Sequence, residues 1–118
     1  MPDYNSLVPM VANAAVAVSG NIASLVLNAR ASGVVQRTQL KMLKAQTAKV
    51  LTEARAYLAG DIVVTNLEQI VKTQEYIDTL VQQGKLHDAS LDMAMEQLSV
   101  LNRLLRENLE RFKNGEWW

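Results

Sequence analysis

The chain has 118 residues, with 12 basic and 12 acidic side chains, one histidine and no cysteine. The lack of cysteine excludes a disulfide scaffold, a thiolate metal site and a cysteine nucleophile, and a hydrophobic share of 49% excludes wholesale disorder. The net charge of zero conceals two opposite halves, because residues 1–59 hold six bases and two acids whereas residues 60–118 hold six bases and ten acids.

The apolar periodicity predicts an all-α fold, with a single helical domain over residues 1–118 built from helical hairpins as an up-down bundle of about four helices. The expected helices span about residues 6–31, 34–59, 65–83 and 89–114, and short loops favour antiparallel neighbours. Asn5 or Ser6 is the expected first cap. Four glycines are expected to end the helices: Gly33, Gly60, Gly84 and Gly115.

The first helix carries no charge over its core segment, residues 6–29, and the uncharged run from Tyr4 to Ala29 exceeds the roughly 20 residues that cross a bilayer. On a helical wheel, small or amide side chains share one arc: Asn13, Ala17, Gly20, Asn21, Ser24 and Asn28. The larger apolar residues lie on the opposite side: Val8, Val11, Val18, Ile22, Leu25 and Val26. Small residues allow helices to approach closely. The face therefore indicates either self-association or membrane insertion, and the sequence leaves both open.

The second segment, residues 30–59, is predicted to be a basic amphipathic helix. Its basic stripe consists of Arg30, Arg37, Lys41, Lys44 and Arg55. The acidic segment that follows, residues 61–83, favours ion pairing within the chain or between subunits. Anionic lipid headgroups are the alternative partner, and nucleic acid is not expected because no aromatic residues interleave with the bases.

The start of the third helix is predicted from a capping signal. Thr65 is followed three residues later by Glu68, which is the spacing of a capping box. The apolar residues 62–64 are interpreted as the approach to this helix, because a single short strand would have no pairing partner.

The fourth helix, residues 88–114, has the spacing of a coiled-coil seam. The seam residues are Leu91, Met95, Leu98, Asn102, Leu105, Leu109 and Phe112. Leu101 and Leu104 are expected to widen this apolar face. Asn102 either specifies register or is solvated at the edge of the seam. The aromatic tail, residues 115–118, ends in Trp117 and Trp118, which are expected to anchor at a bilayer interface or in a neighbouring subunit.

The sequence offers no catalytic, metal-binding or cofactor-binding motif. The single histidine, His87, stands beside Asp88 in a predicted turn, and no phosphate-binding glycine loop is present.

We expect a non-enzymatic assembly protein of bacterial or viral type, a homo-oligomer or a subunit of a larger assembly. It would self-associate through the first helix and the seam of the fourth. The alternatives are a single-span or conditionally inserting, pore- or channel-forming membrane protein and a monomeric four-helix adaptor or chaperone. Met1–Tyr4 lacks the basic residues of a secretory signal, and a cytoplasmic, virion or membrane-associated location stays open.

Overall fold

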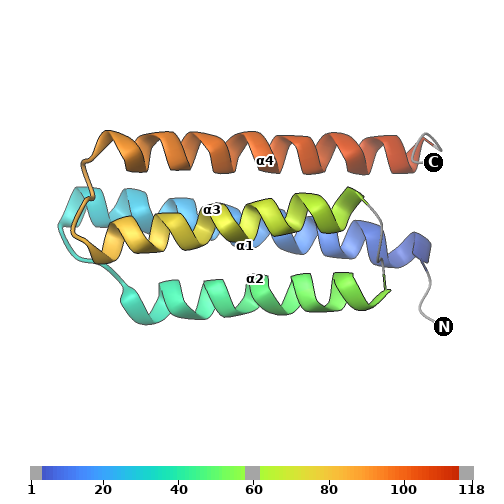
Figure 1. Ribbon diagram of the computed structural model, residues 1–118, viewed down its shortest axis with the longest axis horizontal. Helices are drawn as coiled ribbons and strands as arrows, with labels where there is room; N and C mark the ends of the chain where they lie inside the picture. Colours follow the sequence, from blue (N-terminus) through green and yellow to red (C-terminus); the bar gives the residue numbers. More distant parts are fainter. Residues whose placement is uncertain (1–3, 58–61, 115–118) are drawn as a thin grey trace.

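The computed structural model describes residues 4–57 and 62–114, which form four helices (Figure 1). They are α1 (Tyr4–Ser32), α2 (Arg37–Tyr57), α3 (Ile62–Gln82) and α4 (Ala89–Lys113). Successive helices run antiparallel, and the described residues contain no strand. The predicted all-α bundle of about four helices is therefore confirmed.

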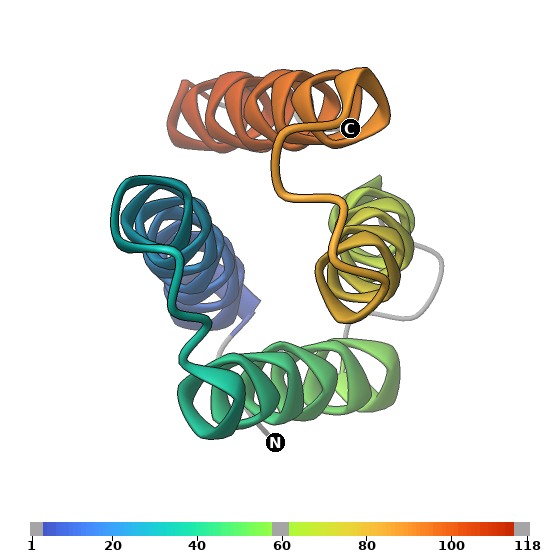
Figure 2. The same cartoon turned by 90° about the vertical axis from the view of Figure 1, so that its left-hand side faces the viewer.

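The four helices occupy the corners of a square when the bundle is viewed along its length (Figure 2). Each helix contacts its two neighbours, and α1 and α3 also contact each other across one diagonal. No described residues of α2 and α4 make such a contact across the other diagonal. The core is consequently centred between α1 and α3, and every helix keeps an outer face toward solvent.

The side of α1 that carries the larger apolar residues fills this core. Val8, Ile22 and Val26 are fully buried, and they pack in one cluster with apolar residues of the other three helices. Burial of such a side chain stabilises the fold by about 1.5–3 kcal/mol. The larger apolar side of α1 is therefore buried in the bundle, and the small-residue arc faces outward.

Two glycines end their helices as predicted. Gly33 adopts a φ of 75° and Gly84 a φ of 74°, a left-handed conformation that glycine adopts without steric cost. After α3, the N–H of Gly84 donates to the carbonyl of Val81 at 3.1 Å, and the N–H of Lys85 donates to that of Leu80 at 3.0 Å. These two hydrogen bonds form a Schellman motif. The expected stops at Gly60 and Gly115 lie outside the described residues.

Two predicted helix starts are wrong. α1 begins at Tyr4, so Asn5 and Ser6 lie inside it rather than at its cap. α3 begins at Ile62, so Thr65 lies inside the helix and does not cap it. Val63 and Val64 are buried in the core. Their burial, about 1.5 kcal/mol or more each, outweighs a cap worth about 1 kcal/mol.

Candidate functional site

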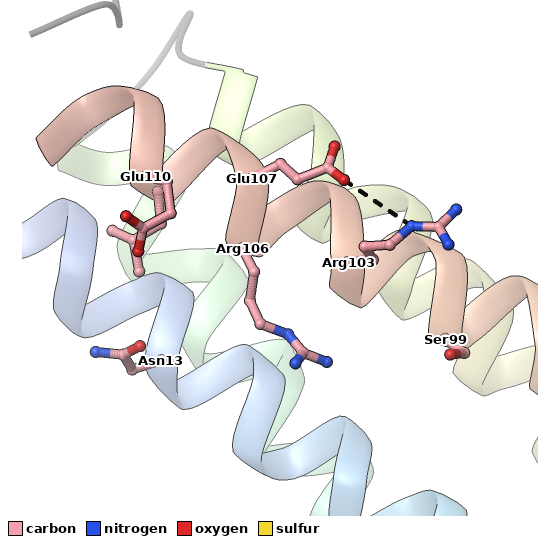
Figure 3. Close-up of a pocket in the computed structure, with 7 residues that line it drawn as sticks. Asn13, Ser99, Arg103, Arg106, Glu107 and Glu110 are labelled. Carbon is pink, nitrogen blue, oxygen red and sulfur yellow. Dashed lines mark ion pairs between the residues drawn. The ribbon is translucent and has the colours of Figure 1, made fainter. Parts of the chain in front are cut away.

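A pocket with a volume of 610 Å³ lies between α1 and α4 (Figure 3). It is lined by Asn13, Ser99, Arg103, Arg106, Glu107, Leu109 and Glu110. Arg106 reaches from α4 toward α1, whereas Arg103 and Glu107 form a 4.0 Å ion pair on the side of α4 that faces away from α1. Both partners of that pair are exposed, so it contributes little to stability. The pocket is open to solvent, and all of its lining residues except Leu109 are polar or charged.

Metal binding has no support in the part of the chain that the structure describes. Its histidine and carboxylate side chains form no group of three that could hold a metal ion. His87 is exposed in the turn before α4, and the neighbouring Asp88 carboxylate accepts a 2.8 Å hydrogen bond from the Ser90 backbone N–H. This bond caps α4 and lowers the pKa of Asp88, with smaller help from the Ser90 side chain and Lys85.

The basic stripe is divided between two helices, and three of its members are paired within the chain. Lys44 Nζ lies 2.6 Å from Asp78 Oδ2, and Arg55 Nη2 lies 3.2 Å from Glu68 Oε1. Arg30 Nη2 lies 2.6 Å from Asp92 Oδ1, and its Nε donates to the Leu86 carbonyl at 2.7 Å. Pairing within the chain, one of the two predicted arrangements, is thus present.

The prediction of one continuous stripe on the second helix is wrong for Arg30. Gly33 ends α1 just after Arg30, which therefore belongs to the last turn of α1. A cation is favourable there because it meets the negative end of the helix dipole. Arg37 and Lys41 are exposed on α2 and form no ion pair with other described residues.

The predicted seam of α4 is an apolar face, and other helices of the same chain cover it. Met95 of the seam is half-buried. The seam leucines are buried in the core: Leu91, Leu98, Leu105 and Leu109. α1 and α3 both contact α4, so the seam is occupied within the bundle and is not open to a second copy. That corrects the expectation of self-association through the seam. The side chain of Phe112 and the tail tryptophans Trp117 and Trp118 lie outside the described residues.

Asn102 is buried, so the interpretation of a solvated residue at the edge of the seam is wrong. Its side chain is 8% exposed, and its Oδ1 has no hydrogen-bond partner among the described residues. A buried polar pair elsewhere in the core was not predicted. Gln74 Nε2 donates to Ser19 Oγ at 3.1 Å across the diagonal between α3 and α1.

The small-residue arc of α1 lies on the surface of the bundle. All six of its members are exposed: Asn13, Ala17, Gly20, Asn21, Ser24 and Asn28. A Cβ atom added at Gly20 would meet nothing within 4 Å. Two larger side chains on the same face were missed, Met10 at 54% and Leu27 at 56% exposure. The spacing of three and four residues from Met10 through Asn13, Ala17, Gly20 and Ser24 to Leu27 could have identified them.

α1 also meets the requirements of length and composition for a membrane span between Val8 and Ser32. The core helix of a soluble bundle meets the same requirements. The larger apolar side chains of α1 face the other helices, so lipid would reach them only if the bundle opened.

A second exposed apolar surface lies on α4, opposite its buried seam. Met93, Val100 and Leu104 are 71%, 37% and 41% exposed. Leu104 therefore does not widen the core face as expected, whereas Leu101 does, because it is buried. Tyr76 of α3 lies beside Met93 and Val100 in a groove of 560 Å³.

Comparison with known proteins gives no assignment. No protein family, curated protein or solved structure matches the chain.

Proposed function

We propose that this protein is a non-enzymatic assembly protein that binds copies of itself through the outer face of α1. This face, the α1 outer face, consists of Met10, Asn13, Ala17, Gly20, Ser24 and Leu27. The observation that carries the proposal is that these residues remain exposed after the bundle has buried its core. An uncharged helix face with two large apolar side chains in solvent favours contact with another apolar or small-residue surface.

The α1 outer face is complementary to itself in an antiparallel pair. When Ala17 of one copy lies opposite Gly20 of the other, Met10 lies opposite Leu27. The same register places Asn13 opposite Ser24, where an amide and a hydroxyl can exchange a hydrogen bond. The centre of the contact holds only small side chains, so the two helices can approach to 8 Å or less, which is about the lower limit for ordinary helix pairs. At each end of the contact, Met10 of one copy packs against Leu27 of the other.

The ion pairs described above lie within one chain, whereas the proposed contact between copies is uncharged. Arg55 and Lys44 of α2 are paired with α3 of the same chain, and Arg30 of α1 with α4. The α1 outer face has no charge to pair. Self-association through it therefore depends on shape, apolar burial and amide hydrogen bonds.

Sedimentation velocity in detergent-free buffer tests this proposal. The wild type is expected to form concentration-dependent oligomers. Ala17→Glu places a charge at the centre of the contact and should weaken it by about tenfold or more, since an unpaired charge there must lose water. The matched control is Ala56→Glu, which changes an exposed alanine of α2 and should leave association unchanged. Circular dichroism checks that all variants keep their helices.

Two results would overturn the proposal. A wild type that stays monomeric at about 1 mM would favour the monomeric adaptor or chaperone instead. Equal association of the wild type and Ala17→Glu would show that another surface is responsible.

Membrane insertion is the second candidate, favoured by the length and composition of α1. Flotation with anionic vesicles measures it directly. Wild-type protein that floats with the vesicles, and Ala17→Glu protein that does not, would support insertion of α1. Protein that stays at the bottom in both cases contradicts it.

A further inference from the structure

The outer face of α4 carries a second apolar stripe. The α4 outer stripe consists of Met93, Gln97, Val100 and Leu104, spaced by four, three and four residues. This spacing keeps the residues on one side of the helix, as in a coiled-coil seam. The buried seam packs into the core on the other side of α4. Its three apolar members are the exposed side chains described above.

We propose that the α4 outer stripe pairs two copies of this chain, with the two α4 helices antiparallel around a twofold axis. In the register that we infer, Met93 of each copy lies opposite Leu104 of the other, and Gln97 lies opposite Val100. Every apolar residue of the stripe then meets a residue of the other stripe. This contact is separate from the α1 outer face and goes beyond the function proposed above.

The charges beside the stripe favour a second copy of the chain as its partner, and they favour one alignment of the two helices. Glu96 and Arg103 flank the stripe on the same side, where residues of two antiparallel helices meet. In the proposed register Glu96 of each copy faces Arg103 of the other, which gives two reciprocal ion pairs. A shift of one heptad toward the C-terminus would instead place Glu96 against Glu110, and Arg103 against its own counterpart. The charges therefore favour one alignment and oppose the next.

Both charged residues are free to make this contact. Within the chain, Arg103 meets Glu107 only at 4.0 Å, with both side chains largely in solvent. Glu96 is exposed and forms no ion pair with other described residues. Neither residue gives up a strong interaction when the second copy binds.

The groove between α3 and α4 provides room for a side chain of the second copy. It is lined by Tyr76, Ser90, Met93, Ala94, Glu96, Gln97 and Val100, and its volume is 560 Å³. The small side chains Ser90 and Ala94 leave space beside Met93, and Leu104 of the second copy lies opposite Met93 in the proposed register. Leu104 is thus positioned to enter the groove as a knob enters a hole.

The contact is short, which sets its expected strength. Residues 93–104 extend over about 18 Å of helix. The buried area would fall below the roughly 800 Å² per partner of a standard stable interface. We therefore expect a weak dimer. The α1 outer face alone, or the α4 outer stripe alone, would join copies only into dimers. With both the α1 outer face and the α4 outer stripe intact, copies join into larger species.

Charge reversal in an Ala17→Glu background tests the proposal, because that background weakens the α1 contact. We expect the Ala17→Glu protein to dimerise still, in a concentration-dependent manner. Glu96→Arg alone, or Arg103→Glu alone, should weaken the dimer by about tenfold, and the two together should restore it to within about threefold. Glu53→Arg is the matched control, since Glu53 is exposed on α2 and should leave the dimer unchanged. Sedimentation equilibrium gives the dissociation constants.

The outcomes separate the two proposals. An Ala17→Glu protein that is monomeric up to about 1 mM, or a double reversal that does not restore pairing, overturns the α4 contact. If the Ala17→Glu background and the wild type associate equally, and the charge reversals behave as expected, the α4 contact stands and the α1 contact fails.

Discussion

Two buried amides of the helical core each carry a polar atom without a hydrogen-bond partner among the described residues. Asn66 and Asn102 are each 8% exposed, and Asn66 Nδ2 and Asn102 Oδ1 lack hydrogen-bond partners among the described residues. An unpaired buried polar atom costs about 1–3 kcal/mol. Gln74, in contrast, is paired with Ser19, so its burial is largely compensated. A polar residue at a core position opposes alternative packings in which it would meet only apolar groups.

Replacing Asn102 with leucine is expected to stabilise the fold. Leucine is similar in size and removes the unpaired oxygen, so the free energy of unfolding should rise by about 1–2 kcal/mol. Urea denaturation measures the change. Gln74→Leu is the comparison, and it should lower the stability or leave it unchanged because Ser19 Oγ loses its partner. A loss of stability in Asn102→Leu would show that its oxygen is hydrogen-bonded in solution.

Helix ends show where local sequence signals succeed and where they fail. Gly33 and Gly84 could be predicted as stops because a left-handed residue is a local requirement that glycine meets best. The start of α3 could not be predicted from Thr65, because the burial of Val63 and Val64 depends on neighbouring helices that a local pattern does not contain. The same reason explains the missed stripe on α4. Its spacing is visible in the sequence, but which of two apolar faces is buried depends on the packing of the bundle.

The cap of α4 gives a prediction that depends on pH. The Ser90 N–H bonded to the Asp88 carboxylate lowers its pKa in the folded state from the ordinary 3.8. The charged cap therefore stabilises the fold fully above pH 3.8, and this contribution is lost as the pH falls through the lower folded-state pKa. Asp88→Ala should reduce the melting temperature at neutral pH, with a smaller difference from the wild type in acid.

Asp88→Asn serves as the control for that comparison. Asparagine keeps an oxygen that can accept the Ser90 N–H but has no charge to lose. Its melting temperature should stay close to that of the wild type at neutral pH. If the Asp88→Ala difference were the same at neutral and acidic pH, the cap would not act through the ionised carboxylate.

At the scale of the whole molecule, the order of the basic and acidic halves along the chain determines which charges meet. The basic half precedes the acidic half, and an up-down bundle places α2 beside α3, so Lys44–Asp78 and Arg55–Glu68 form within one chain. The sequence predicts the pairing but not whether it is internal, because that depends on which helices are neighbours. The grouping of the small residues on one side of α1 could be predicted from its wheel. Its environment could not, because a core helix and a membrane span share the same composition.

Salt is expected to affect the two proposed contacts in opposite ways. The α4 contact includes reciprocal pairs between Glu96 and Arg103, whereas the α1 outer face has no charge. Raising NaCl from about 50 mM to about 1 M shortens the screening length from about 14 Å to about 3 Å. The Ala17→Glu protein, which keeps only the α4 contact, should dissociate several-fold more readily. A Leu104→Asn protein, which keeps only the α1 contact, should associate equally well or better, because salts that are excluded from apolar surface favour its burial. Sedimentation equilibrium at both concentrations measures the two responses, and equal weakening in both proteins would contradict the assignment of charge to α4 and packing to α1.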